Sequence, residues 1–176
     1  MRYRYLIALG SNVRHARHGS PRAVVRAALV ALGAAGVTVK RVSCVRASNP
    51  LGPSRRRYAN GAAIMATDLD PLALLSLCKQ IERAFGRRSR SRAWSARVLD
   101  IDIVLWSGGI WASDELVVPH PEFRNREFVL EPARDICPDW RDPLTGRTVR
   151  QLHWRLTRPV ASRSCSLAPR HRATGP

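Results

Sequence analysis

Residues 97–105, Arg-Val-Leu-Asp-Ile-Asp-Ile-Val-Leu, place two carboxylates inside an otherwise apolar, β-branched run. Such a run is typical of a buried strand, whose side chains alternate between two faces. Asp100 and Asp102 therefore share one face. Two negative charges side by side on a core strand repel each other and lose hydration, so they need a compensating group. A divalent metal ion can be that compensating group, and Mg²⁺ is the first candidate. Pairing with nearby arginines, or a frayed strand end in water, is the alternative.

The rest of the chain alternates strand and helix signals. Each of two helices has an N-cap followed by proline at its first position, at Ser20-Pro21 and at Asp70-Pro71. The first is expected to end near Gly33 or Gly36 and the second at Gly86. The predicted strands cover residues 3–9, 37–45, 58–67 and 98–106, with a loop over 48–53. This order predicts an α+β fold with a ferredoxin-like β-α-β-β-α-β core, in which a mainly antiparallel sheet is flanked by helices.

Three smaller elements are expected after the last long strand. They are a turn at 107–109 leading into a short hairpin strand, a rigid extended loop at 119–121, and a short helix within 125–136. The length of 176 residues and the hydrophobic content of 45% suit one domain, here placed at 1–155. Residues 156–176 contain no acid and no periodicity, which predicts a basic, disordered tail.

Composition limits the classes of protein that remain. No apolar run is long enough to cross a bilayer, and the apolar part of the N-terminus is too short for a signal peptide. The four cysteines lie far apart without a Cys-x-x-Cys pair, so reduced thiols in a cytoplasm are expected. The net charge of +17 raises the prospect of a nucleic acid or polyphosphate partner, but the basic residues are dispersed and do not choose between them.

A basic segment comes directly before the aspartate pair. Its arginines are Arg87, Arg88, Arg90, Arg92 and Arg97. Arginine binds phosphate oxygens through two parallel hydrogen bonds, and a metal on two aspartates bridges phosphate oxygens from the other side. Together they predict a polyphosphate clamp; a solvated, mobile loop is the alternative for the arginines alone.

Several single residues have both a functional and a structural interpretation. His120, between two prolines, either donates to a phosphate or ribose oxygen or caps a strand end. Trp94 either closes over a planar ligand or anchors its loop. Tyr58 and Asn60 share a strand face, where a ring and an amide suit a flat heterocycle, and Phe128 suits the opposite side; plain packing is the alternative for each.

Six motifs in order now carry a resemblance to the 6-hydroxymethyl-7,8-dihydropterin pyrophosphokinase family over about residues 4–153. The matching segments are Ala8-Leu9-Gly10-Ser11-Asn12; Ser48-x-Pro50-x-Gly52-Pro53; Tyr58-x-Asn60; Ile81-Glu82 with Gly86-Arg87; Trp94-x-x-Arg97-x-Leu99-Asp100-Ile101-Asp102; and Pro119-His120-Pro121 with Arg126-x-Phe128-Val129-Leu130-x-Pro132. The resemblance implies a folate-pathway enzyme that transfers diphosphate from ATP to the pterin hydroxymethyl group and releases AMP.

The resemblance also implies roles for individual residues. It assigns catalysis to Arg87, Arg97, Asp100 and Asp102, with the two aspartates as ligands of two Mg²⁺ ions. It assigns ATP binding to Glu82, Trp94, Arg97, His120 and Arg126. It assigns pterin binding to Gly10, Ser48, Asn49, Leu51, Tyr58, Asn60, Trp94 and Phe128. The expected partners are these two small molecules, for a cytoplasmic monomer with no membrane partner; a nucleic acid is the less favoured partner.

The chain departs from the family pattern beside the tryptophan. Ala93, Ser95 and Ala96 stand where the family usually has a basic residue before the tryptophan and glycine-proline after it. The alternatives to an active enzyme are therefore a catalytically impaired paralogue that binds pterin or nucleotide, and a basic nucleic-acid-binding protein.

Overall fold

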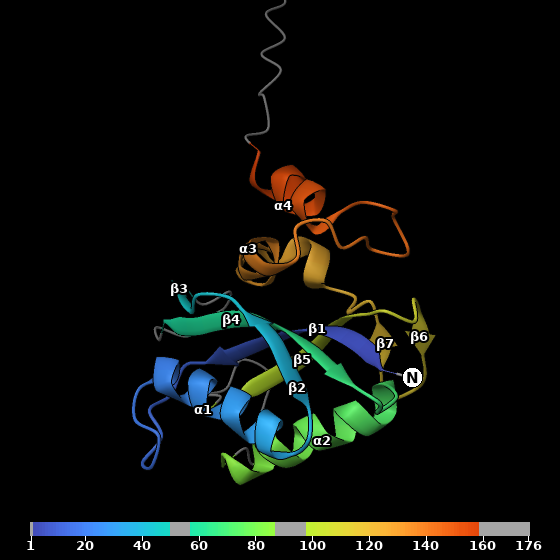
Figure 1. Cartoon of the computed structure of the whole chain (residues 1–176). Helices are drawn as coiled ribbons and strands as arrows, with labels where there is room; N and C mark the ends of the chain where they lie inside the picture. The colour runs from blue at the N-terminus through green and yellow to red at the C-terminus, as the bar shows by residue number, and fades with distance from the viewer. Residues whose placement is uncertain (1, 50–56, 87–97, 159–176) are drawn as a thin grey trace, which may run out of the picture.

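The computed structural model describes residues 2–49, 57–86 and 98–158 and contains the expected core order (Figure 1). The core elements are β1 (Tyr3–Ser11), α1 (Pro21–Ala34), β2 (Thr38–Val42), β3 (Arg46–Ser48), β4 (Tyr58–Thr67), α2 (Pro71–Ala84) and β5 (Asp100–Trp106). They are followed by β6 (Trp111–Ala112), β7 (Val117–Val118), the 3₁₀ turn η1 (Phe123–Asn125), α3 (Glu127–Ile136) and α4 (Val149–Thr157). Among the described helices, none is long and apolar enough to cross a membrane.

The main sheet has the strand order β2-β4-β1-β5, with β3 also paired to β4. Each of these pairs is antiparallel. With β2 and β3 taken as one interrupted strand, this is the order of a ferredoxin-like sheet, which confirms the predicted α+β class.

The strand expected at 37–45 is interrupted in the structure. Its register on β4 shifts between Val39 and Arg41, and residues 43–45 belong to no strand. Ser43 takes over part of the ladder, because its N–H donates to Ala62 O at 2.9 Å and its hydroxyl accepts from Ala62 N at 2.9 Å. A side-chain hydroxyl in place of a backbone carbonyl bends the chain away, and β3 then begins at Arg46.

Both predicted helix starts are confirmed by their capping bonds. The hydroxyl of Ser20 accepts from Ala23 N at 3.4 Å, and the carboxylate of Asp70 accepts from Ala73 N at 2.8 Å. The first helix ends at Ala34, and Gly36, at φ +89°, reverses the chain into β2. The second ends at Ala84, two residues before Gly86.

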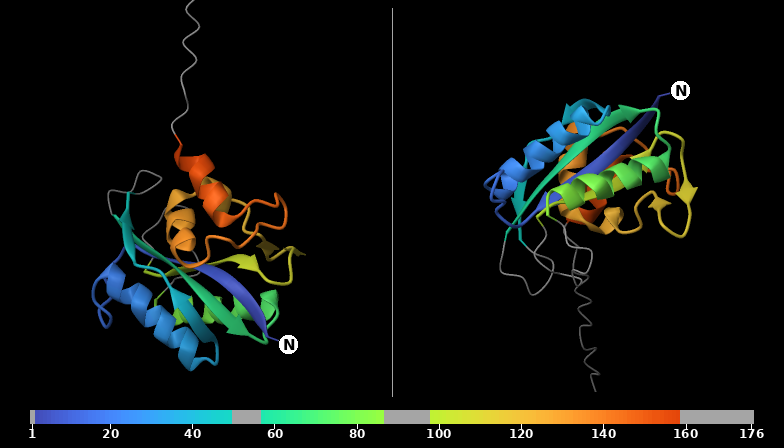
Figure 2. Two further views of the ribbon diagram at one scale, coloured as in Figure 1. Left: turned by 45° about the horizontal axis from the view of Figure 1, so that its top comes forward. Right: turned by 90° about the horizontal axis from the view of Figure 1, so that it is seen from below.

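The sheet is covered on both faces (Figure 2). On one face α1 and α2 pack against side chains such as Ile7, Leu9 and Ile101. On the other face α3 packs against Leu6, Ala62 and other small or branched residues, and α4 packs on α3. Along most of the strands, adjacent residues thus belong to different cores, as the alternation of side chains requires. The exception is the bulge between β1 and β5, where the neighbours Val104 and Leu105 belong to the same core.

Two late elements differ from the sequence-based expectation. The turn at 107–109 leads into β6, but β6 pairs with β7 in a separate two-stranded sheet. Helix α4 was not predicted, although Thr148 and Gln151 form a capping box at its start. It extends to Thr157, so the predicted start of the tail at residue 156 falls within this helix. Residues 159–176 lie outside the described part of the chain.

A buried ion pair ties the segment after α3 to the turn before it. Asp142 is fully buried and accepts two hydrogen bonds from Arg124, at 2.7 and 2.8 Å. Thr145 Oγ1 and Leu144 N also donate to this carboxylate. Burial by itself raises the pKa of Asp142, but the hydrogen bonds from Arg124, Thr145 and Leu144 outweigh it and hold the pKa below its ordinary value.

Replacing Asp142 by alanine should lower the free energy of unfolding by about 3 kcal/mol, because it leaves the Arg124 charge without its buried partner. Urea denaturation followed by circular dichroism measures this loss. The wild-type contribution of Asp142 to the free energy of unfolding should be present above the unfolded pKa of about 4 and disappear as the pH falls through the lower folded pKa.

Asp139→Ala is the matched control: its ion pair with Arg150 spans 3.0 Å but Asp139 is 80% exposed, so a loss below about 1 kcal/mol is expected. Equal losses would contradict the assignment.

Candidate functional site

The candidate residues that the sheet carries lie on the face that α3 covers. Gly10 pairs with Asn60 of β4 on one side and with Asp100 of β5 on the other. One step along, Ala8 pairs with Ala62 and with Asp102. Directly paired residues of antiparallel strands share a face. The amide of Asn60 and both carboxylates therefore project to the same side, at the end of the sheet where β1 ends.

The predicted same-face placement of the two aspartates is thus confirmed. Both are half-buried, and Ile101 between them is buried on the α2 side. Among the described residues, no group of three or more His, Cys, Asp or Glu side chains is arranged to hold a metal. A cation here would take its remaining ligands from water and phosphate oxygens, which is how Mg²⁺ is usually bound in phosphoryl-transfer sites.

Gly10 allows the amide of Asn60 to approach the sheet closely. A Cβ at residue 10 would lie 3.1 Å from Asn60 Oδ1. On its other side the amide nitrogen donates to Ser48 Oγ at 2.6 Å. Since Ser48 pairs with Tyr58, four of the predicted pterin residues form one continuous patch across β3, β4 and β1. Asn60 is buried and Tyr58 half-buried; Asn49 follows the patch as an exposed residue.

His120 approaches the aspartates from the loop after β7. Its backbone N–H donates to Val104 O of β5 at 3.0 Å. Its Nδ1 accepts from Glu122 N at 3.2 Å, so the neutral ring carries its hydrogen on Nε2. Burial lowers the pKa of His120, with Arg126 acting in the same direction and Asp102 opposing. A neutral imidazole with a fixed N–H donor results.

Arg126 and Phe128 come from the N-terminal end of α3, where Arg126 is the N-cap residue. The Arg126 guanidinium carbon lies 6.0 Å from the centre of the Phe128 ring. Phe128 is half-buried and packs on the same core that Ala8 borders. Arginine and phenylalanine are thus presented by one helix end, on the covered face where the row of Asn60, Gly10 and Asp100 lies.

Arg46 is a site-supporting residue that the sequence analysis missed. It pairs with Asn60 in the sheet and bonds to Asp135 of α3 at 2.6 Å and to Glu131 at 3.1 Å. Hydrogen bonding to Asp135, with the charge of Glu131, raises the pKa of Arg46. Its place two residues before Ser48 on one strand face was the available signal, but its partners on the helix, Glu131 and Asp135, are 85 and 89 residues away in sequence.

Glu82 occupies a different position from the other candidates. It lies on α2, is 4% exposed, and its carboxylate accepts from Ile101 N at 2.7 Å. Because β5 is the edge strand of the sheet, this carboxylate supplies an acceptor that a further strand would otherwise provide. The contact fixes the backbone of β5 at Ile101, which stands between the two aspartates. A role of Glu82 in ATP binding stays a prediction.

Four predicted site residues cannot be placed. Leu51, Arg87, Trp94 and Arg97 lie outside the described residues, as do Ala93, Ser95 and Ala96. The cysteines that are described form no disulfide. Burial raises the pKa of Cys78 to about 12, with Glu82 and Asp102 adding to the shift, so this thiol stays protonated.

Comparison with known proteins gives a consistent result. A family model described as 7,8-dihydro-6-hydroxymethylpterin-pyrophosphokinase matches residues 6–138. A 2-amino-4-hydroxy-6-hydroxymethyldihydropteridine pyrophosphokinase of Synechocystis is 35% identical over 84% of this chain and 73% of that protein. The protein of the same name from Pseudomonas aeruginosa is 39% identical over 85% of this chain and 89% of that protein.

Solved structures share the fold. The crystal structure of wild-type Plasmodium falciparum HPPK-DHPS matches with a TM-score of 0.64 and 13% identity. The match covers 88% of this chain and 41% of that one, so the present chain spans less than half the length of this structural neighbour. At this identity the comparison supports the fold alone.

Titration of His120 tests the geometry of the site without any substrate. In metal-free buffer, NMR of the imidazole should give a midpoint below the ordinary 6.5. Asp102→Asn should lower the midpoint further, because it removes a negative charge that favours the imidazolium, and Arg126→Ala should raise it. Asp68→Asn removes an exposed carboxylate that contacts Arg2 and should leave the midpoint unchanged. If neither site variant shifts it, His120 does not face these groups.

Proposed function

Because this chain belongs to the 7,8-dihydro-6-hydroxymethylpterin-pyrophosphokinase family, we propose that it transfers diphosphate from ATP to 6-hydroxymethyl-7,8-dihydropterin. The observation that carries the proposal is the row of Asn60, Gly10 and Asp100, which sets an amide and a carboxylate on one face. The alcohol oxygen would bond to the β-phosphorus as the bond from that phosphorus to the α-phosphate oxygen breaks; AMP would leave, and the alcohol proton would pass to water. Neither a non-catalytic paralogue nor a nucleic-acid-binding protein is favoured by the family membership.

The pterin would lie over the patch formed by Ser48, Tyr58 and Asn60. The Asn60 amide, oriented by Ser48, offers hydrogen-bonding groups to the edge of the heterocycle. Tyr58 and Phe128 would stack on its two sides. Asn49, at the end of β3, and Leu51 would complete the pocket.

ATP would lie at the opposite end of the row from Asn60, beside Asp100 and Asp102. Asp100 and Asp102 would hold two Mg²⁺ ions, whose contribution is to neutralise charge on the phosphates. His120 suits a neutral donor to a phosphate or ribose oxygen through Nε2, and Arg126 supplies a cation nearby. The proposed nucleotide side also includes Arg87, Arg97, Trp94 and Glu82. We propose that the protein acts as a monomer in the cytoplasm.

Replacing either aspartate should stop catalysis without unfolding the chain. Asp100→Asn and Asp102→Asn should each lower kcat at least about 100-fold, since charge stabilisation of the transferred group is lost. AMP release from ATP and the dihydropterin alcohol, with excess Mg²⁺, is the measurement. Asp68→Asn should keep wild-type activity. A wild-type protein that releases no AMP would refute the proposed reaction, and full activity in both aspartate variants would refute their role.

Substitution of Gly10 should separate pterin binding from ATP binding. In Gly10→Ala the new Cβ would press on Asn60 Oδ1 at 3.1 Å and disturb its bond to Ser48. Loss of about one well-oriented hydrogen bond predicts a KM for the pterin raised about tenfold. The KM for ATP should change little. Gly33→Ala, on α1 where a Cβ meets open space, is the matched control; equal effects on both KM values would contradict the placement.

A further inference from the structure

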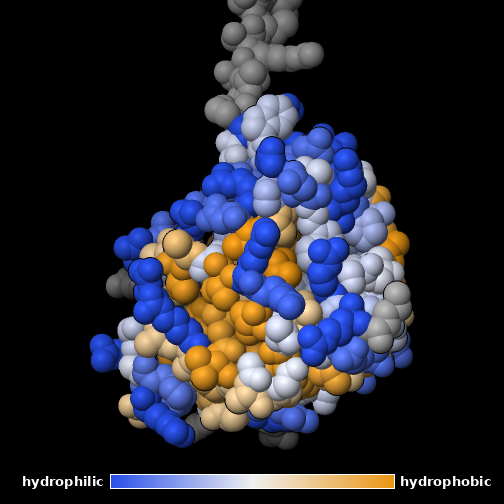
Figure 3. Space-filling view, in the orientation of Figure 1, coloured by the Kyte–Doolittle hydropathy of each residue, from blue (hydrophilic) through white to orange (hydrophobic). Residues whose placement is uncertain are grey.

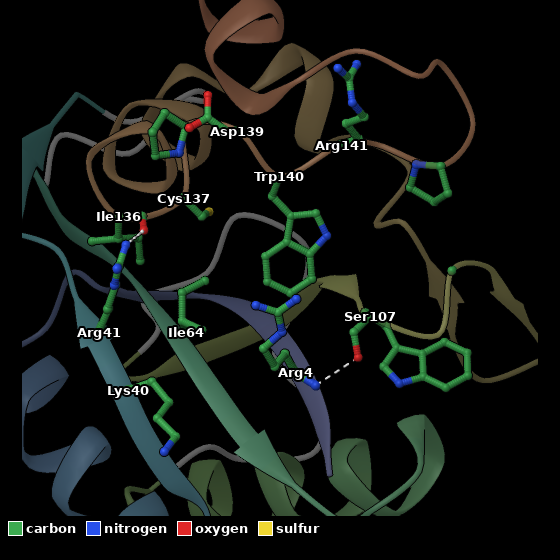
Figure 4. A pocket seen from close by; sticks show the side chains of 14 residues that line it. Arg4, Lys40, Arg41, Ile64, Ser107, Ile136, Cys137, Asp139, Trp140 and Arg141 are labelled. Atoms are coloured by element: carbon green, nitrogen blue, oxygen red, sulfur yellow. Dashed lines mark hydrogen bonds between the residues drawn. The ribbon is translucent and has the colours of Figure 1, made fainter. Parts of the chain in front are cut away.

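A second cleft lies at the other end of the face that carries the proposed site. It has a volume of about 870 Å³ and opens between the strands β1, β2 and β4 and the segment that follows α3 (Figure 4). Arg4, which lines it, lies on β1 four residues before Ala8, the partner of Asp102, and six residues before Gly10, the partner of Asp100. Four to six residues of extended strand span about 13 to 20 Å. The cleft is therefore separate from the aspartates. Its size is within the range of pockets that bind small organic molecules.

The lining of this cleft is strongly basic. Arg4, Lys40, Arg41 and Arg141 contribute four cations. Asp139 is the acidic lining residue, and its carboxylate is paired with Arg150 at 3.0 Å. The excess of positive charge favours an anionic occupant.

The surface between these cations is apolar and aromatic. Ile64 of β4 and Ile136 at the end of α3 contribute apolar side chains, and the ring of Trp140 extends toward Arg4, whose guanidinium carbon is 5.7 Å from the ring centre. Figure 3 shows an apolar area near the middle of this side of the molecule, with hydrophilic side chains over and around it. An occupant with an apolar or flat body would therefore find matching surface.

Two hydrogen bonds between side chains and backbone hold the lining of the cleft in place. Arg41 Nη1 donates to Ile136 O, at the end of α3, at 3.1 Å. Arg4 N donates to Ser107 Oγ at 2.9 Å, which ties the start of β1 to the end of β5. Because a guanidinium has five N–H donors, the bond to Ile136 uses only part of the capacity of Arg41. The cleft is thus organised without a ligand.

We propose that this cleft binds a small organic anion. Its aromatic or aliphatic body lies on Ile64 and beside Trp140, and its carboxylate or phosphate group is held by Arg4, Lys40 and Arg41. Lys40 contributes a mobile ammonium and the two arginines planar forks, which suit either kind of oxyanion. This binding does not depend on the proposed catalytic function.

Calorimetry on the full chain with three matched probes tests the proposal. The probes are 1-naphthoate, 1-naphthyl phosphate and neutral 1-naphthalenemethanol. At least one anion should bind saturably with one site per chain, about tenfold or more tighter than the neutral alcohol, as loss of charge-assisted hydrogen bonds predicts. A preference for one anion identifies the head group. Equal affinity for the alcohol, or no saturable binding of either anion, would overturn the proposal.

Variants locate the binding. The double variant Arg4→Gln and Lys40→Gln should weaken binding of the preferred anion about tenfold or more. The matched double variant Arg22→Gln and Arg26→Gln removes the same charge from exposed positions of α1 and should bind like the wild type. Asp102→Asn should also bind like the wild type, which separates this cleft from the nucleotide site. Weakening in either control that equals the cleft variant would refute the location, whatever the result of the AMP assay.

Discussion

The continuous antiparallel register that residues 7–10 of β1 keep with both β4 and β5 is the constraint on which the candidate site depends. It sets Asn60, Gly10 and Asp100 in one row and Asp102 one step along, although these residues are up to ninety-two positions apart in sequence. A slip of one residue in either pairing would turn the amide or the carboxylates into the core beneath α1 and α2. The apolar residues between them, such as Leu9 and Ile101, hold that register because they are buried on the opposite face.

Helix α3 connects the two ends of this face. Its N-terminal end presents Arg126 and Phe128, and its last carbonyl accepts from Arg41 in the basic cleft. Arg46 fixes the middle of the helix to β3 through Glu131 and Asp135, and the Arg124–Asp142 pair fixes the turn before it. The groups that approach the aspartates from outside the sheet are therefore carried by a segment that is itself held by charged contacts. Hydrophobic packing against Leu6, Ala62 and their neighbours supplies the rest.

Most of the core could be read from local signals. Pairing of proline with Ser20 and with Asp70 located both helix starts, and alternation located β1, β4 and β5. The interruption between β2 and β3 could not be predicted, because it depends on Ser43 bonding to Ala62 across the sheet. Helix α4 is only nine residues long and lies beside the basic, polar tail, and its start is marked by a capping box rather than by a proline. Within the site, the shared face of Asp100 and Asp102 followed from spacing, whereas the different position of Glu82 required the packing of α2 on β5.

The sequence by itself determined the family, through ordered motifs, and the side of the strand on which each candidate residue stands, through the two-residue period of a strand. Only the tertiary structure decided which of those residues meet. The approach of His120 to Asp102, the bond between Asn60 and Ser48, and the capping of Ile101 by Glu82 join segments that no local pattern relates. The same holds for the basic cleft, where Arg4, Lys40 and Trp140 come from three distant segments. Such contacts arise from how the helices pack on the two faces of the sheet, because burial of apolar side chains, not the polar residues themselves, sets where those segments lie.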